Sequence, residues 1–327
     1  MVEMIETGVT YEELADIERE FEQVETEMLR RQYELSRPLY EKRAAIVAKI
    51  PNFWALVFEQ SPPEIDEYIQ PQDAALLLAS LKNISVSRFE LENGQNGDPR
   101  SIAIRFEFGD NEHFEDKVLE KKFWWRTSEN YTGLVSEPVN INWKAGKDLT
   151  DGLLTAVQKV WAQGGPVLSG KGKPAPTPEA QALKAKIEET GMGGVSFFCW
   201  FGYVGKRISA EESAAFAAKE ADEFNRRKAG EKIEEKADED DDDEEDEFEY
   251  EIFPDGDDIA TAIAQDLWPD ALTYFSKFIR SQGGAAAHDD GDRDLLSMIA
   301  QAQEAGDLSD AEFETDEDDD DEEMGDA

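Results

Sequence analysis

The sequence has few of the residues on which disulfide bonding, metal binding and secretion depend. Its 327 residues include one cysteine and two histidines. One cysteine excludes a disulfide framework and a zinc site built from several cysteines, and it fits a reducing compartment. No run of about 18 apolar residues occurs, so no membrane span is predicted. The first residues have neither the basic nor the apolar region of a secretory signal, so we expect no secretion.

Basic residues are scarce beside acidic ones. The chain has 33 Lys and Arg against 76 Asp and Glu, a net charge of −43. Nucleic acids and anionic membranes would repel such a chain, so we expect no sequence-specific nucleic-acid binding and no membrane binding. A strongly basic protein is the expected partner. Hydrophobic residues still make up 40% and aromatic residues 10%, too much for a chain that is disordered throughout.

The acidic residues are concentrated in two segments. Residues 237–251 contain twelve acidic residues and no basic one, and residues 303–327 contain fourteen and none. Repulsion at this density predicts extended, solvated segments. We therefore expect a folded body with disordered ends and two irregular stretches inside it. The disordered ends are residues 1–9 and 281–327, the flexible linker is 164–192, and the charged, acidic insertion is 205–252.

One long helix is predicted over residues 10–50. Thr10 and Glu13 have the spacing of a capping box, and Pro51 is expected to end the helix. Between them, apolar residues recur at alternating steps of three and four, interrupted at Arg31, as in a coiled-coil seam. The seam consists of Leu14, Ile17, Phe21, Val24, Met28, Leu35 and Leu39. No second stretch of this kind occurs, so the expected partner is a second copy in a homodimer; a helix that lies across its own domain is the alternative.

The remaining pattern predicts an α+β domain over residues 51–280, in which helices cover an antiparallel sheet. Segments with the two-residue period of strands are residues 84–91, 102–108, 119–125 and 135–143. Helical patterns follow at residues 153–161, 209–236, 259–267 and 272–279. Asp148 or Thr150 is expected to cap the first of these helices. The strongly aromatic segment 195–203 is predicted to lie in the core.

Motifs for catalysis or cofactor binding are weak. Residues 165–172 match a phosphate-binding loop for seven positions, but Gly172 stands where a hydroxyl is needed and Pro174 where a helix must begin. Cys199 lies among aromatic residues, where a thiol is expected to be inert. Asp289–Asp294 lacks the spacing of a calcium-binding loop. We therefore expect a protein that is not an enzyme and that has no cofactor and no specific metal site.

Five segments carry a pattern that one known family shares. They are RPLYEKRAAIVAKIPNFW at residues 37–54, FEFGDNEHFEDKVL at 106–119, INWKAGKDLT at 141–150, SFFCWF at 196–201 and DLWPDALTY at 266–274. In this order they resemble the nucleosome assembly protein family, in its SET branch. The resemblance implies a dimer on a long antiparallel helix pair, an α/β "earmuff" domain at each end, and a disordered acidic tail. The chain departs from the family by its long insertion between Tyr203 and Pro254.

The resemblance implies a histone chaperone, which binds core histones, shields them from DNA and promotes nucleosome assembly and disassembly. It would act on chromatin in the nucleus and be present also in the cytoplasm. Carboxylates suit this role, because they compete with DNA phosphates for histone lysines and arginines. The residues expected to bind histones are Glu107, Asp110, Glu112, Glu115, Asp148, Asp266 and Asp270, with Phe313 as an aromatic anchor in the tail.

Two other functions fit the sequence. The first is an acidic inhibitor or scaffold that docks on a phosphatase or a histone acetyltransferase. The second is a DNA mimic or ion buffer, for which acidity alone would suffice and the folded body would be dispensable. A chaperone, in contrast, should need its folded body to bind histones.

Overall fold

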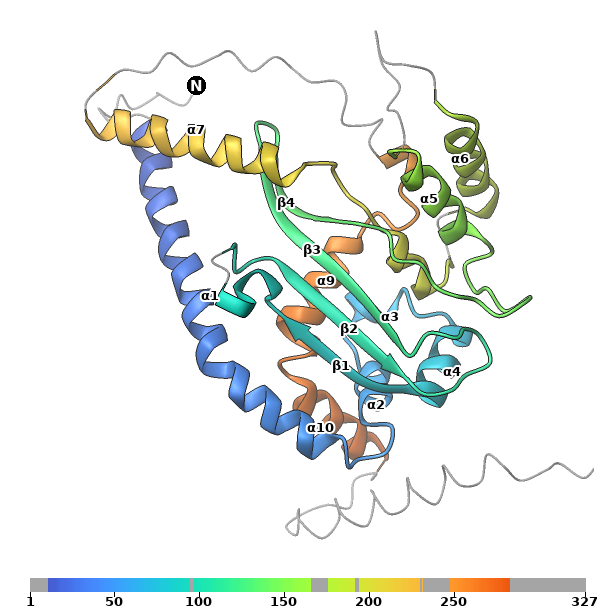
Figure 1. Ribbon diagram of the computed structural model, residues 1–327. Coiled ribbons are helices and arrows are strands. Elements are labelled where there is room, and N and C mark those ends of the chain that lie inside the picture. The colour runs from blue at the N-terminus through green and yellow to red at the C-terminus, as the bar shows by residue number, and fades with distance from the viewer. Residues whose placement is uncertain are drawn as a thin grey trace, which may run out of the picture. The chain divides into compact units, whose positions relative to one another are not determined.

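The structure is a computed structural model, shown in Figure 1, that describes residues 11–94, 97–165, 176–191, 194–229, 231 and 248–282. Several predictions concern residues outside these ranges: Thr10, most of the loop 165–172, Asp289–Asp294, most of the two acidic runs, and Phe313. The chain divides into a unit that extends to Phe278 and a second unit from Ile279, of which residues 279–282 are described. Of the helices in the described residues, none combines the length and apolarity that a membrane crossing requires.

The first element is α1 (Tyr11–Val47), a helix of 37 residues that confirms the predicted long helix. At 1.5 Å per residue it is about 55 Å long. Pro38 lies inside it and removes one backbone donor without ending the helix. The helix stops before Pro51, ahead of a turn in which Asn52 adopts the left-handed conformation with φ 53°.

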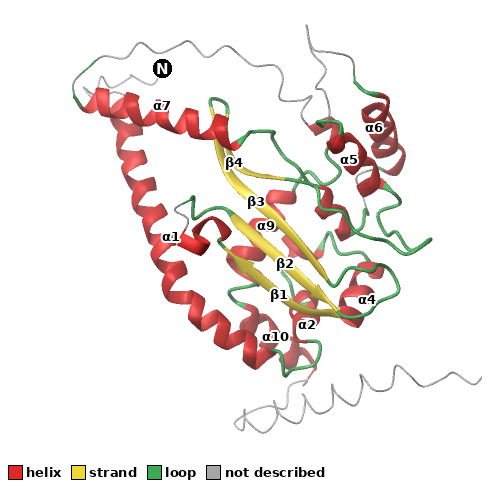
Figure 2. Cartoon of the chain, viewed as in Figure 1, coloured by secondary structure: helices red, strands yellow, loops and turns green. Residues whose placement is uncertain are grey.

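Three short helices lead from α1 into a four-stranded antiparallel sheet. The helices are α2 (Phe53–Glu59), α3 (Pro63–Asp66) and α4 (Pro71–Ser80). The strands are β1 (Leu81–Ser87), β2 (Ile102–Phe108), β3 (Val118–Ser128) and β4 (Tyr131–Ser136), which pair in chain order. The 3₁₀ turn η1 (Phe89–Gly94) follows β1. Figure 2 shows the four strands side by side, with helices behind them, so the predicted fold class is confirmed.

The observed strands agree with the sequence at β2 and differ from it at two others. The predicted strand 84–91 is wrong beyond Ser87, because the 3₁₀ turn η1 follows there, and β1 begins earlier, at Leu81. β2 has the predicted bounds, and its outward residues Arg105 and Glu107 are half-buried between buried neighbours. The predicted strand 135–143 is wrong beyond Ser136. Pro138 lacks a backbone donor. The N–H of Ser136 donates to the carbonyl oxygen of Val204, just after η2, and the N–H of Val139 donates to the carbonyl oxygen of Phe201 in η2.

The second half of the body is mainly helical. Its elements are α5 (Leu153–Ala162), α6 (Pro178–Thr190), the 3₁₀ turn η2 (Phe197–Gly202), α7 (Ala210–Lys228), the 3₁₀ turn η3 (Phe248–Tyr250), α9 (Gly256–Ala262), the π-helical turn η4 (Ile263–Leu267) and α10 (Ala271–Gln282). The flexible linker predicted over 164–192 is wrong for residues 178–190, which form α6. The Thr177 hydroxyl caps this helix by accepting a hydrogen bond from Ala180 N–H (3.2 Å). Leu183 of the same helix is buried.

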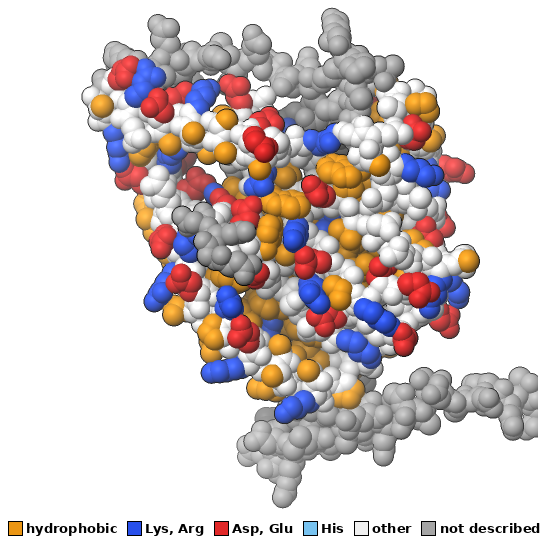
Figure 3. Space-filling view, in the orientation of Figure 1, with side chains coloured by type: hydrophobic (Ala, Val, Ile, Leu, Met, Phe, Trp, Pro, Cys, Tyr) orange, Lys and Arg blue, Asp and Glu red, His pale blue; other side chains and the backbone are white. Residues whose placement is uncertain are grey.

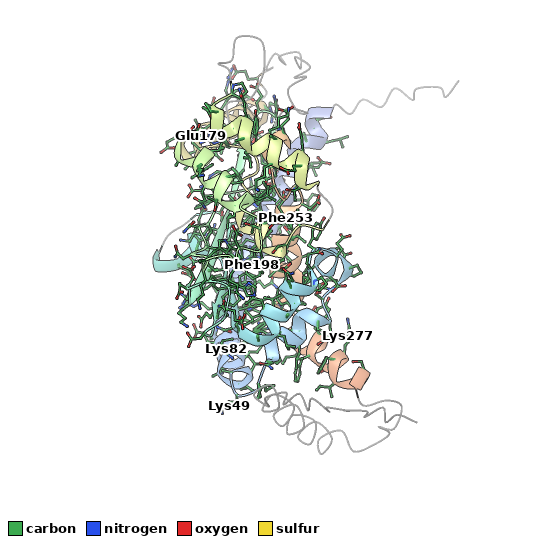
Figure 4. The ribbon with its side chains drawn as sticks, turned by 90° about the vertical axis from the view of Figure 1, so that its right-hand side faces the viewer. Lys49, Lys82, Glu179, Phe198, Phe253 and Lys277 are labelled. Carbon is green, nitrogen blue, oxygen red and sulfur yellow. The ribbon has the colours of Figure 1, made fainter. Side chains whose placement is uncertain are left out.

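Aromatic residues on the inner side of the sheet form the core. Phe106 of β2 packs against three rings of η2, with ring centroids 5.8 to 6.2 Å apart. The aromatic segment 195–203 therefore lies in the core, as predicted. Cys199 in the same turn is fully buried, and burial raises the pKa of its thiol. Figure 4 shows Phe198 and Phe253 inside the body.

Candidate functional site

Four of the predicted site residues have ion-pair partners beside them. The pairs are Glu107 with Arg105 (3.2 Å), Asp110 with Lys117, Glu112 with Lys147 (3.0 Å) and Glu115 with Lys144 (3.9 Å). The hydrogen bond and charge of Lys117 hold the pKa of Asp110 below its ordinary value, and Lys147 does the same for Glu112. A basic partner would have to displace these cations. In Figure 3, acidic and basic side chains lie interspersed over the face in view.

Asp148 has a structural role in the turn before α5. Its carboxylate accepts hydrogen bonds from the N–H groups of Thr150 (2.8 Å) and Gly152 (3.0 Å) and from the Thr150 hydroxyl (2.6 Å). The Thr150 hydroxyl in turn accepts from Leu154 N–H (3.4 Å). Both residues therefore stabilise the start of this helix, and three donors already occupy the Asp148 carboxylate.

Asp266 and Asp270 belong to a different group of side chains, which we name the acidic face. It consists of six carboxylates whose charges act on two tyrosines: Glu64, Glu67, Asp255, Asp258, Asp266 and Asp270. They come from α3, α9, η4 and the residues that flank these elements. Five of the six are exposed, and Asp266 is half-buried.

The charges of three of these carboxylates act on each tyrosine. The Tyr68 hydroxyl donates to Asp255 (2.6 Å), and this hydrogen bond, burial and the charges of Asp255, Glu67 and Asp258 raise the Tyr68 pKa. The Tyr274 hydroxyl donates to Asp266 (2.9 Å).

Burial, the hydrogen bond to Asp266 and the charges of Asp266, Asp270 and Glu64 raise the pKa of Tyr274 to about 12. Negative charge thus acts on both tyrosines from several elements at once.

Few cations oppose the charge of the acidic face. Among the residues that the structure describes, no lysine or arginine forms an ion pair with any of its six carboxylates. Lys277 lies over the ring of Tyr274, with its nitrogen 4.3 Å from the ring centroid. The acidic face therefore has an excess of negative charge that the paired carboxylates beside β2 lack.

Arg43 holds the segment behind the acidic face against α1. Its guanidinium donates to the carbonyl oxygens of Trp268 (2.6 Å) and Pro269 (2.9 Å). It also lies over the rings of Tyr40, Trp54 and Trp268, with its central carbon 4.6 to 5.6 Å from their centroids. Burial lowers the pKa of Arg43, while the charge of Asp270 opposes this effect.

The predicted dimerisation residues lie on one face of α1 and are all exposed. Their exposed fractions run from 53% for Ile17 to 65% for Phe21 and Met28. The opposite face contacts the chain's own domain: Arg30 donates to Gly97 O (3.1 Å) and the Tyr33 hydroxyl to Glu92 (3.1 Å). The helix does lie along its own domain, but its apolar seam points away from it.

Helix α7 lies within the insertion and contacts the first half of α1 through two ion pairs. Arg227 pairs with Asp16 (3.0 Å) and Lys228 with Glu20 (2.6 Å). At its other end, Ser213 accepts a hydrogen bond from Thr127 N–H of β3 (3.0 Å). Figure 1 shows α7 between the β3–β4 end of the sheet and the start of α1.

Two charged side chains are buried where the insertion begins and ends. The first is Lys121 of β3, whose ammonium group donates to the carbonyl oxygens of Glu137 (3.0 Å), Phe201 (3.2 Å) and Tyr203 (2.8 Å). Burial lowers the pKa of Lys121 to about 7.

The second is Glu251, whose carboxylate accepts from the N–H groups of Val204 (3.0 Å), Gly205 (3.2 Å) and Phe253 (3.3 Å). Burial raises the pKa of Glu251 to about 7. Because Gly205 and Glu251 stand at opposite ends of the insertion, this carboxylate ties those ends together.

Within the described ranges, no group of three or more His, Cys, Asp or Glu side chains is arranged to hold a metal ion. Among the side chains described, the acidic face thus offers a concentration of negative charge and no metal-binding group.

Comparisons with known proteins agree on one family. The family model described as "Nucleosome assembly protein (NAP)" matches residues 47–277. A Schizosaccharomyces pombe protein named as a putative nucleosome assembly protein is 37% identical over 156 residues, which cover 44% of this chain and 62% of that protein. Protein SET of Drosophila melanogaster is 36% identical over 125 residues, which cover 37% and 43%. The chain spans less than two thirds of the length of these relatives.

Solved structures share the fold. A mutant of Ccp1 has a TM-score of 0.50 and 25% identity, covering 84% of this chain and 97% of that one. Vps75 has a TM-score of 0.50 and 22% identity, covering 82% and 97%.

Proposed function

This chain belongs to the nucleosome assembly protein family, and from that membership we propose that it is a histone chaperone. It would bind core histones, keep them from non-productive contact with DNA, and release them for nucleosome assembly. Its place of action would be the nucleus, with a further population in the cytoplasm. The whole proposal concerns binding and release, with no covalent step.

The observation that carries this proposal is the acidic face. Histones hold DNA through lysines and arginines that neutralise phosphates, and carboxylates without cation partners compete for the same side chains. An exposed ion pair contributes about 0–1 kcal/mol, so six such contacts give an attraction that is additive in part and sensitive to salt. Screening sets in beyond about 8 Å at physiological ionic strength. Binding of this kind is reversible, as a protein that must surrender its cargo to DNA requires.

We further propose that the exposed seam of α1 forms a homodimer. Leu14 and Ile46 mark the ends of its row of exposed apolar residues, which is about 48 Å long at 1.5 Å per residue. An apolar row of this length in water favours a partner with the same pattern. In an antiparallel pair, the two-fold axis passes through the middle of this row, so Arg31 would lie close to the axis. The opposite face of α1 holds the domain, so two domains would lie on the two sides of one helix pair.

Two variants of equal charge test the role of the acidic face. The first replaces Glu64, Glu67, Asp258 and Asp270 by their amides, and the second does the same to Glu107, Asp110, Glu112 and Glu115. At about 0.5 kcal/mol for each exposed pair, the first should lose about 2 kcal/mol, or roughly 30-fold in histone affinity. The second should lose much less, because lysines and an arginine already neutralise its carboxylates.

Fluorescence titration of isolated, labelled core-histone pairs at physiological salt measures both losses. Equal losses from the two variants would show that net charge alone controls binding, as expected of a DNA mimic. No loss from either variant would place the histone contact outside both groups of carboxylates.

A further inference from the structure

A groove lies between helix α1 and strand β1, which is an edge strand of the sheet. Among the strands that the structure describes, β1 pairs only with β2, and Figure 1 shows α1 on the free side of β1. Two contacts hold α1 to the domain here, from Tyr33 to Glu92 (3.1 Å) and from Arg43 to the carbonyl oxygen of Trp268 (2.6 Å). Residues of both elements line the groove, which has a volume of about 210 Å³. Sites for drug-sized molecules have about 300–1,000 Å³, so this groove suits a smaller group.

The pairing of the strands shows which backbone groups of β1 face this groove. The N–H of Phe108 donates towards β3 (2.9 Å). The N–H groups of Phe106 and Ile104 point the same way, because backbone groups two residues apart lie on one side of a strand. Their partners in β1 are Ile84 and Val86. These two residues therefore belong to pairs without hydrogen bonds and direct their own backbone groups away from β2.

Side chains already occupy two positions of this edge, and Val86 lies between them. The Trp268 indole donates to Ile84 O (3.1 Å), and the backbone of Arg88 is hydrogen-bonded to the Tyr33 hydroxyl. Both contacts come from the groove side, in agreement with the strand pairing. Within the described residues, no group hydrogen-bonds to the N–H or the carbonyl oxygen of Val86. The edge thus presents one donor and one acceptor to the groove.

The walls of the groove suit an uncharged side chain. Trp54, Tyr40 and Trp268 line it, and the ring centroids of the last two lie 4.0 Å apart. Among its charged residues, Arg37 pairs with Glu41 (3.3 Å), and the other two have the partners given above. The apolar seam of α1 points away from the domain, so the proposed dimer would leave the groove open.

We propose that this groove takes one extended segment of a partner protein, which adds to β1 as a further strand. An extended peptide supplies the acceptor and the donor that the Val86 N–H and carbonyl oxygen lack. Its residue beside Val86 is uncharged and aliphatic, to match the walls. Basic residues flank it, because the chain's net charge of −43 attracts them. The small volume beside α1 excludes the edge of a second folded sheet. The proposal does not depend on histone binding.

A fluorescein-labelled peptide of sequence RKTVTKR tests this proposal by anisotropy on the full chain, at physiological salt and without histones. The unaltered chain should bind it. The same peptide with N-methyl groups on its three central residues should bind about tenfold more weakly, because it has lost the donors that face β1. N-methyl groups on its two terminal arginines keep the charge and should leave binding unchanged. Equal binding of all three peptides, or no binding by the unaltered chain, would overturn the proposed strand pairing.

Two pairs of variants locate the peptide on the chain. Val86→Pro removes the free N–H, and proline is accepted on an edge strand whose N–H faces outward. Val86→Thr keeps both the N–H and the branched shape. Ala44→Trp fills the groove from α1, whereas Ala45→Trp adds the same ring at the next position, which does not line the groove. Val86→Pro and Ala44→Trp should each weaken peptide binding about tenfold, and their two controls should leave it unchanged.

Thermal unfolding shows whether each variant is folded, and Ala44→Trp still tests the site if Val86→Pro does not fold. Peptide binding that a folded Ala44→Trp chain retains in full would overturn the proposed site, as would full binding by folded Val86→Pro. A change of oligomeric state caused by Val86→Pro in sedimentation would assign this edge to a second copy and overturn the proposed occupant.

Discussion

Replacing Phe21 and Met28 by glutamate should convert the proposed dimer to monomers. Both side chains are 65% exposed in the single chain, and full burial of a large apolar side chain contributes about 1.5–3 kcal/mol. Each therefore contributes about 1–2 kcal/mol on pairing, or about 4–8 kcal/mol for the four positions of a dimer. Burying the new carboxylates costs several kcal/mol more. Together these losses weaken a nanomolar dimer to about millimolar.

Light scattering and sedimentation over a range of concentrations measure this change. The matched control is Gln23→Glu with Gln32→Glu, which adds the same charge to the same helix at exposed polar positions and should leave the dimer intact. Circular dichroism should show an unchanged helix content in both variants, because Tyr33 and Arg43 hold α1 on its domain. A folded Phe21→Glu, Met28→Glu chain that remains dimeric would refute the seam as the interface.

Three more predictions concern stability and binding. Burial raises the pKa of Glu251 to about 7, so its contribution to the free energy of unfolding is largest below about pH 4.5 and declines as pH rises towards 7. Chemical unfolding should therefore show a smaller decline in stability over this interval for the Glu251→Gln variant. An equal decline in both proteins would contradict this pKa. Arg43→Ala removes two charged hydrogen bonds and contacts with three rings, so urea unfolding should show a loss of about 2–4 kcal/mol, against little change for Arg37→Ala in an exposed pair. Deleting residues 303–327 should lower histone affinity and flatten its dependence on salt without abolishing binding, and complete loss in a titration would assign the histone contact to the tail.

The sequence alone predicted the elements in which apolar residues repeat at one fixed spacing. The α1 seam and the strand β2 each repeat an apolar residue at a fixed spacing, and that spacing selects one face of a helix or strand. The predicted strand beyond Ser136 failed because Pro138 interrupts pairing, although apolar residues continue. The helix α6 was missed because the predicted linker was extended past Thr177, a capping residue with proline after it.

Contacts between segments that are distant in the sequence could not be predicted from it. The acidic face joins Tyr68 to Asp255, which lies 187 positions later, so only Asp266 and Asp270 of its six carboxylates were predicted. The acids beside β2 were predicted as free contacts, but lysines of the segment 141–150 pair with two of them. The burial of Lys121 could not be predicted from the sequence, because a lysine in a strand usually faces water.

The central claim is that a folded acidic surface takes histones from DNA, and a competition assay tests it most directly. A core-histone pair is first bound non-specifically to DNA at physiological salt, the chain is added, and the DNA that returns to its free mobility in a gel is measured. We predict release by the unaltered chain and by the Glu107, Asp110, Glu112 and Glu115 amide variant, and little release by the Glu64, Glu67, Asp258 and Asp270 amide variant. No release by the unaltered chain, or equal release by both variants, would contradict the account.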